Sequence, residues 1–246
     1  MKAFQLSSLF IFLTFARANP IGGGPLVNPP PPYKIDGLYG DSSVHDPDCS
    51  QLQRMSKDTD RLVVALCAVS GLKGDNDTPN IKSFITEIKP DPPSKTVIKA
   101  EFTVHDDEGK VLKGTIEAKD AMKFKPNPAK KDKNRKAAWW SAGFASLISQ
   151  QQTLKQGFDK GKLAKADFHY GLQLLTGRQF FPVTANEETH GVFEKVAAAV
   201  DKGPLLIKVK DDKDFKPKLL AKGELYAVRG YKDDKITLWN SALGQK

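Results

Sequence analysis

Apolar residues recur at helical spacing in four segments of the chain. The most apolar of them, residues 62–72, follows the potential capping residues Thr59 and Asp60 and precedes a glycine at position 74. Flanks of this kind are typical of helix ends, so we predict a buried helix at 62–72. The same spacing predicts further helices at 81–88, 137–154 and 192–200.

Alternating apolar and polar residues predict strands elsewhere. Two of them, 96–103 and 111–116, flank the turn-forming sequence DDEGK at 106–110, as in a β-hairpin. Helices thus dominate the first part of the chain and strands the last third, without a regular strand–helix alternation. This order predicts the α+β class rather than a doubly wound sheet. Three shorter strands are predicted at 205–209, 225–228 and 236–239.

The N-terminus has the pattern of a secretory signal peptide. Lys2 precedes a mostly apolar stretch at 3–15, and Ala16-Arg17-Ala18 places small residues at the −3 and −1 positions of a cleavage site. An uncleaved membrane anchor is the alternative, but the stretch is shorter than a bilayer span requires. We predict that residues 1–18 are removed and that the protein is secreted to the extracellular space.

The next segment, residues 19–33, reads NPIGGGPLVNPPPPY. Prolines and glycines at this density are incompatible with a helix or a central strand. We predict an extended linker, with a proline-rich ligand for another protein as the alternative. The remaining residues, 34–246, contain no internal repeat and form the folded part of the protein.

The amino-acid composition excludes only a few classes of protein. With 39% hydrophobic and 27% charged residues, the chain is neither collagen, nor a coiled coil, nor wholly disordered. Its 38 lysines and arginines exceed its 29 aspartates and glutamates, for a net charge of +9. The basic segment 123–136 resembles a nucleic-acid patch, but in an exported chain we interpret it as a solvated loop and expect no nucleic-acid partner.

Common catalytic motifs are missing from the sequence. HExxH, GxSxG, the Walker A motif and GxGxxG do not occur. The histidines at 45, 105, 169 and 190 are scattered, and we interpret His169 as a structural residue rather than a metal ligand. Two cysteines are too few for a zinc–cysteine cluster. We therefore expect neither a metal nor a cofactor.

Five pieces of sequence stand in an order that is known from one enzyme family. They are DPDCSQLQ with DTDRLVVALCAV (46–53, 58–69), TVHDDEGK with GTIE (103–110, 114–117), AWWSAGFA (138–145), GLQLLTG (171–177), and GELYAV with ITLWNSALG (223–228, 236–244). From about residue 46 to residue 244 the chain resembles the protease core of the calpain family, a branch of the papain-like cysteine proteases. The resemblance implies a calpain-like domain at 34–246, with a helical lobe at about 34–165 and an antiparallel β lobe at about 166–246.

The resemblance also implies where catalytic residues would stand. The cysteine nucleophile of the family begins the buried helix, and that position holds Asp60, or Thr59 in the alternative alignment. The histidine position holds Glu224. The asparagine is kept as Asn240, and the oxyanion glutamine corresponds to Gln53 or Gln51. Without a thiol and an imidazole the acyl-transfer chemistry fails as a unit, so the resemblance implies a pseudoprotease with no catalytic residues.

The cysteines and one asparagine fit an exported protein. An even pair in a secreted chain suggests a disulfide, Cys49–Cys67, with two buried free thiols as the alternative. Cys67 would lie two turns inside the apolar helix, where it could not replace the missing nucleophile. The sequence Asn76-Asp77-Thr78 is an N-glycosylation acceptor.

Two classes of function follow. The first is a secreted, catalytically inactive calpain-like protein that binds a partner protein, as an effector would; we expect a monomer that does not associate with membranes once the signal is removed. The second is an active secreted hydrolase, peptidase-like, that uses Asp60 and Glu224 in altered chemistry. Paired carboxylates across a cleft also occur in glycosidases.

Overall fold

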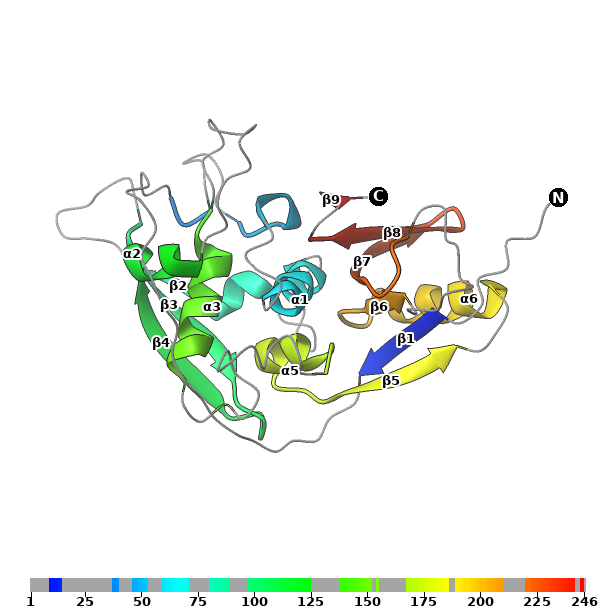
Figure 1. The fold of residues 1–246 in the computed structure, drawn as a ribbon, viewed down its shortest axis with the longest axis horizontal. Helices are drawn as coiled ribbons and strands as arrows, with labels where there is room; N and C mark the ends of the chain where they lie inside the picture. The colour runs from blue at the N-terminus through cyan, green and yellow to red at the C-terminus, as the bar shows by residue number, and fades with distance from the viewer. Residues whose placement is uncertain are drawn as a thin grey trace.

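The structure is a computed structural model of the full chain. It describes residues 9–14, 37–39, 46–52, 59–70, 80–88, 97–124, 138–151, 154, 167–185, 189–209, 220–241 and 244–245. Within these ranges helices and two antiparallel sheets are mixed (Figure 1). The predicted α+β class is therefore confirmed. No helix in the described ranges has both the length and the hydrophobicity needed to cross a bilayer.

The first sheet has three strands in the order β2-β3-β4. They span Ile85–Ile88, Lys99–His105 and Val111–Glu117. Residues alternate between the faces of β3, so that Ala100, Phe102 and Val104 are buried while the residues between them are more exposed. Beside this sheet lie the short helix α2 (Ala118–Ala121), the 3-10 turns η2 (Ile81–Phe84) and η3 (Met122–Phe124), and the helix α3 (Trp140–Gln150).

The second sheet has six strands in the order β5-β1-β6-β7-β8-β9. All neighbouring pairs are antiparallel. The helix α6 (Thr189–Ala199) covers one face, where Val196 packs with Ile207, Tyr226 and Leu238 in a separate apolar cluster. The strands are β1 (Leu9–Thr14), β5 (Phe180–Ala185), β6 (Leu206–Val209), β7 (Leu225–Lys232), β8 (Lys235–Asn240) and β9 (Gly244–Gln245).

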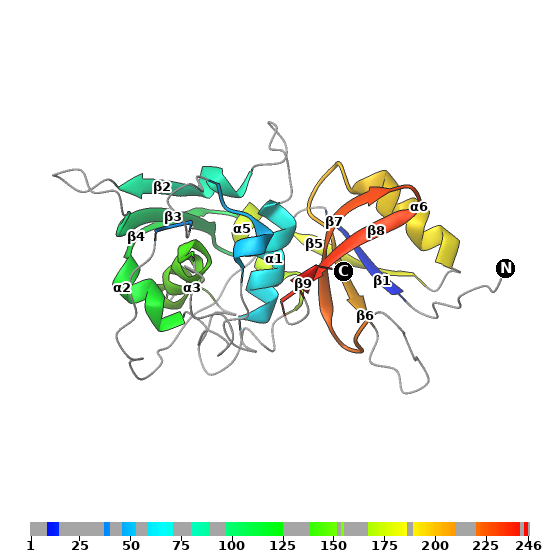
Figure 2. The same ribbon diagram turned by 90° about the horizontal axis from the view of Figure 1, so that it is seen from above.

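Helix α1 (Asp60–Ser70) lies between the two sheets (Figure 2). Every residue from Leu62 to Val69 is buried. The helix packs against α3 and α5 (Tyr170–Thr176) on one side and against β7 on the other. Burial on all sides explains why the sequence of α1 lacks a polar face, and it confirms the predicted buried helix. The 3-10 turn η1 (Cys49–Gln51) lies beside α1.

The predicted helix at 81–88 is wrong. Only residues 81–84 are helical, as the 3-10 turn η2, and Ile85 begins β2. The side chain of Asn80 accepts a hydrogen bond from the backbone of Lys82 at 2.9 Å and starts the turn. β2 then pairs with β3, Ile85 opposite Phe102. The apolar spacing alone favours a helix, but the segment is short, and pairing with β3 makes its second half a strand.

Other predicted elements differ mainly in their ends. The helix at 137–154 shortens to α3, while the strands at 225–228 and 236–239 lengthen into β7 and β8. Strand β5 was not predicted. Residues 34–165 contain β2, β3 and β4 beside their helices and are thus a mixed region, whereas residues 166–246 contain β5 to β9 with α5 and α6.

The apolar part of the predicted signal peptide forms strand β1 of the full-length chain. The strand occupies an internal position of the six-stranded sheet, between β5 and β6. Because the structure contains all 246 residues, the removal of residues 1–18 stays a prediction. The linker at 19–33 lies outside the described residues.

The turn between β3 and β4 is fixed against the end of α5. The Asp106 carboxylate accepts hydrogen bonds from the backbone N–H groups of Glu108 and Lys110 at 2.9 and 2.8 Å. Gly109 has a φ of 77°, and a Cβ there would lie 2.8 Å from the carbonyl oxygen of Gly177. Deeper in the turn, Tyr170 donates to the buried Asp107 at 2.8 Å. Two segments of the family resemblance, TVHDDEGK and GLQLLTG, are thus in contact.

Two histidines near α5 make the stability depend on pH. Burial lowers the pKa of His105 and of His169 from the ordinary value near 6.5. The unfolded chain therefore binds protons first as the pH falls below about 6.5, and the free energy of unfolding decreases. Urea denaturation at pH 7.5 and pH 5.5 measures the decrease. A His105→Gln/His169→Gln variant should lose much of it, and an unchanged pH dependence in that variant would contradict the assignment.

Candidate functional site

Four polar residues meet where α1 begins and β8 ends, and we call them the Asn240 cluster: Asp60, Glu224, Asn240 and Ser241. The hydroxyl of Ser241 donates to the Asp60 carboxylate at 3.1 Å. The side-chain amide of Asn240 donates to the Glu224 carboxylate at 3.3 Å and to the backbone oxygen of Leu225 at 2.8 Å. The structure thus brings Asp60, Glu224 and Asn240, which the family resemblance placed at catalytic positions, into one cluster with Ser241, which lies 181 residues after Asp60.

Burial differs within the Asn240 cluster. Asn240 is only 1% exposed, and its hydrogen bond to Leu225 fixes it to the first residue of β7. Asp60, Glu224 and Ser241 are partly exposed. The two carboxylates can accept hydrogen bonds or hold a proton. Neither can become the strong soft nucleophile that a thiolate provides.

The two cysteines form a second feature, a disulfide bond. Cys49 in η1 and Cys67 in α1 are joined by the predicted disulfide, with Cα atoms 4.8 Å apart. Cys49 and Cys67 are the only cysteines of the chain, so the protein with this disulfide has no free thiol. Cys67 itself is fully buried.

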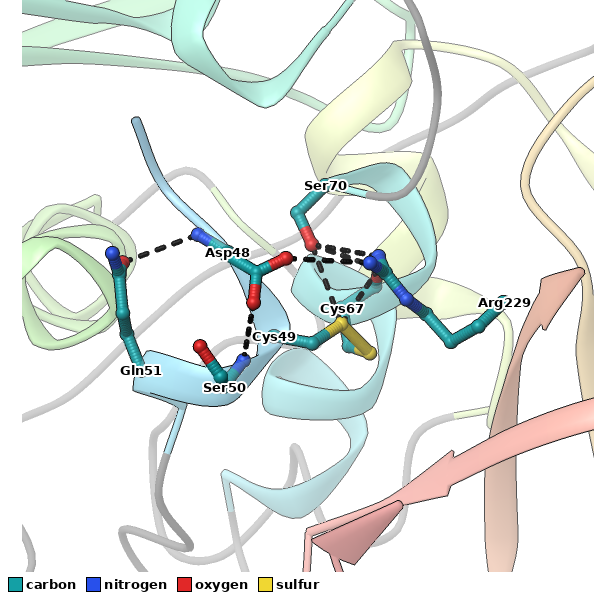
Figure 3. The surroundings of a disulfide bond; sticks show 7 residues. All are labelled: Asp48, Cys49, Ser50, Gln51, Cys67, Ser70 and Arg229. Atoms are coloured by element: carbon teal, nitrogen blue, oxygen red, sulfur yellow. Dashed lines mark hydrogen bonds and ion pairs between the residues drawn. A yellow bond between two sulfur atoms is a disulfide. The ribbon is translucent and has the colours of Figure 1, made fainter. Parts of the chain in front are cut away.

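Arg229 connects β7 to the disulfide (Figure 3). Its guanidinium group donates to the backbone oxygen of Cys67 at 3.1 Å, to the hydroxyl of Ser70 at 3.3 Å and to the carboxylate of Asp48 at 3.3 Å. One side chain of the six-stranded sheet thereby holds both segments that the disulfide joins. Arginine suits this task because its planar group presents several donors in fixed directions.

Asp48 is stabilised as an anion at this point. Burial alone would raise the pKa of its carboxyl group, but hydrogen bonds from Ser50 and the charge of Arg229 outweigh burial and lower the pKa. The carboxylate also caps η1, because the backbone N–H of Ser50 donates to it at 2.8 Å. Gln51 completes a capping box by accepting from the backbone N–H of Asp48 at 3.1 Å.

The side-chain amide of Gln51 is already hydrogen-bonded within the protein. Its side-chain oxygen also accepts from the Trp140 indole at 2.7 Å, and its side-chain nitrogen donates to the backbone oxygen of Asp46 at 2.9 Å. The oxyanion role would require that donor to face a substrate. Gln53, the other predicted oxyanion glutamine, and Asn76 of the glycosylation sequence lie outside the described residues.

Comparisons with known proteins do not assign the chain. No family model and no curated protein matches it. The resemblance to the calpain family therefore depends on the five segments alone. In the structure these segments form η1 and α1, the β3–β4 hairpin, the start of α3, α5, and strands β7 and β8.

The histidines do not join the Asn240 cluster in the described part of the chain. The His105 ring lies in an edge-to-face contact with Phe84, and His169 stands directly before α5. His45 lies outside the described residues, and the structure describes only the backbone of His190, in α6. Within the described ranges no three His, Cys, Asp or Glu residues gather in a way that could hold a metal ion.

Sequence reasoning missed Arg229 and Ser241. A single arginine inside the apolar strand LYAVRGYK is a usable signal, since charged groups in such a setting need partners. Ser241 had no comparable signal, because a serine after Asn240 does not by itself indicate a partner. Its bond to Asp60 depends on the fold.

Proposed function

We propose that this protein is a secreted, catalytically inactive protein with the papain-like architecture of the calpain family, and that it acts by binding a partner protein. The observation that carries the proposal is the disulfide, which uses both cysteines of the chain. A cysteine protease attacks its substrate with a thiolate, and this chain has no thiol left for that step.

The Asn240 cluster supports the same proposal. At the family's nucleophile position Asp60 accepts a hydrogen bond from Ser241. At the histidine position Glu224 accepts one from Asn240, where a catalytic imidazole would have been oriented by the asparagine. These polar residues satisfy one another within the protein, which favours a structural role over a reaction on a bound peptide.

We expect the purified protein to leave casein and fluorogenic peptides uncleaved. A D60C/E224H variant restores a thiol and an imidazole beside Asn240. We expect at most weak activity from it, because the proline and tryptophan that follow the asparagine in the family are replaced by Ser241-Ala242-Leu243, so the tryptophan beside the site is missing. The measurement is peptide hydrolysis over hours. The matched control is D60S/E224H, which has the imidazole without the thiol.

Robust proteolysis by the unmodified protein would contradict the proposal. If Asp60→Ala or Glu224→Ala then abolished that activity, the protein would instead be a hydrolase with altered chemistry. Blocking with a thiol reagent provides a further check, because a protein whose cysteines are paired should not be affected.

A further inference from the structure

Strand β1 holds β5 within the six-stranded sheet. It pairs with β5 from Leu9 opposite Ala185 to Thr14 opposite Phe180, and with β6 from Leu9 opposite Val209 to Phe12 opposite Leu206. In the described residues β5 and β6 do not pair with each other. The position between them is therefore an internal one, with hydrogen-bonding strands on both sides.

The surroundings of this position suit an apolar strand. On one face Ile207 and Val209 of β6 pack with Val196 of α6 in the second apolar cluster, and α6 also lies against β1. On the other face Leu206 belongs to the main core. Cross-strand neighbours share one face of a sheet, so an occupant needs apolar side chains opposite Ile207 and Val209.

Removal of the signal peptide would leave the position between β5 and β6 without a strand. β1 lies entirely within residues 1–18, whose removal is predicted from the sequence. The chain that follows offers no substitute, since residues 20–32 contain six prolines and three successive glycines. Proline lacks the N–H that an internal strand needs on each side.

We propose that in the processed protein the position between β5 and β6 accepts an extended, apolar segment of about six residues from a partner protein, by strand addition. This inference rests on the export and processing that form part of the proposed function. It names the mode of partner binding: main-chain hydrogen bonds to β5 and β6 provide affinity, and side chains opposite β6 select the sequence.

The charge of Lys208 should favour an acidic residue at one position of the bound segment. Lys208 lies in β6 opposite Phe10 of β1 and is partly exposed, with its amine 5.4 Å from the centre of the Phe168 ring. A segment with an acidic residue at this second position would place opposite charges across the strands, whereas a basic residue would place like charges there. Glutamate should therefore be preferred to lysine at that position.

The test uses the protein secreted by expressing cells, with its N-terminus read by sequencing and expected to be Asn19. A fluorescent peptide containing LFIFLT, flanked by solubilising residues, should bind saturably in an anisotropy titration.

Two kinds of modified peptide test the mode of binding. The same peptide N-methylated at Phe10 and Phe12 keeps every side chain but loses backbone hydrogen bonds to the neighbouring strands, and it should bind at least about tenfold more weakly. A peptide with Phe10→Glu should bind about fivefold more tightly than one with Phe10→Lys.

Hydrogen exchange identifies the place of binding without any protein variant. Amides of β6 should exchange faster in the processed protein than in the full-length chain, and addition of the LFIFLT peptide should slow them again. β6 amides that are already protected without peptide would mean that β5, or residues 19–33, close the sheet, and this would overturn the inference.

The remaining outcomes separate this inference from the proposed function. A processed protein that binds neither peptide, or binds the N-methylated one equally well, overturns strand addition alone. A secreted protein that starts at Met1 keeps its own β1, and this overturns strand addition together with the predicted removal of residues 1–18. Proteolysis by a preparation that binds the LFIFLT peptide overturns the pseudoprotease proposal and leaves strand addition standing.

Discussion

Replacing Phe102 with alanine is expected to lower the free energy of unfolding by about 3–5 kcal/mol. Phe102 is fully buried at the centre of β3. Its ring makes edge-to-face contacts with Trp139 and Phe144, at centroid distances of 5.8 and 5.0 Å. The loss combines the transfer energy of the ring with the cost of the cavity. Urea denaturation measures it, and Lys99→Ala, an exposed change in the same strand, should stay within about 0.5 kcal/mol.

A double-mutant cycle with Gly143 tests whether the Phe102 ring packs against α3 as described. A Cβ added at Gly143 of α3 would overlap the Phe102 ring, so Gly143→Ala should be destabilising although alanine favours helices. In a Phe102→Ala background the added methyl group meets no ring and fills part of the cavity. The coupling energy should therefore be favourable. If Gly143→Ala alone increased the stability, the packing of α3 on β3 would have to differ from the one described.

Removal of the Cys49–Cys67 disulfide is expected to cost about 3 kcal/mol. The bond links residues 18 apart, and closing a loop of this length in the unfolded chain accounts for about that free energy in the chain-entropy description. The measurement compares urea denaturation of the wild-type protein with that of a Cys49→Ser/Cys67→Ser variant. Both cysteines are changed together so that no unpaired thiol remains.

The reduced wild-type protein serves as the control for that comparison. A phosphine reductant should lower the midpoint of the wild-type protein towards that of the double serine variant, whose own midpoint should stay the same. A wild-type midpoint that does not respond to complete reduction would mean that the bond contributes no stability, because the hydrogen bonds of Arg229 hold η1 and α1 together without it.

The fold was predictable where the apolar pattern of a segment fitted a single kind of element. Residues 62–69 are apolar throughout and have polar residues on both sides, and in the structure they form a helix that is buried on all sides. The prediction for 81–88 failed because its four apolar residues have helical spacing, whereas the pairing of Ile85–Ile88 with β3 makes the second half a strand. Strand β5 was missed because Pro182 is atypical of strands and is accepted there at the edge of the sheet.

The candidate site was predictable only through the family resemblance. That resemblance put Asp60, Glu224 and Asn240 at related positions, and the structure brings them into one cluster. Their actual partners could not be predicted, because pairs such as Ser241 with Asp60 and Arg229 with Asp48 are each 181 residues apart. Nothing in the local sequence specifies contacts at such a separation.

The place of β1 in the sheet also has a consequence in time. Its partner β5 begins at Phe180, 166 residues after Thr14 (180 − 14). At a synthesis rate of about 5–20 residues per second, the ribosome needs roughly 8–33 s to make that stretch. Throughout this interval the apolar segment has no strand to pair with and is open to the export machinery. Under the proposed export, residues 9–14 therefore act first as part of the signal for secretion. They form strand β1 only in molecules from which the signal peptide has not been removed.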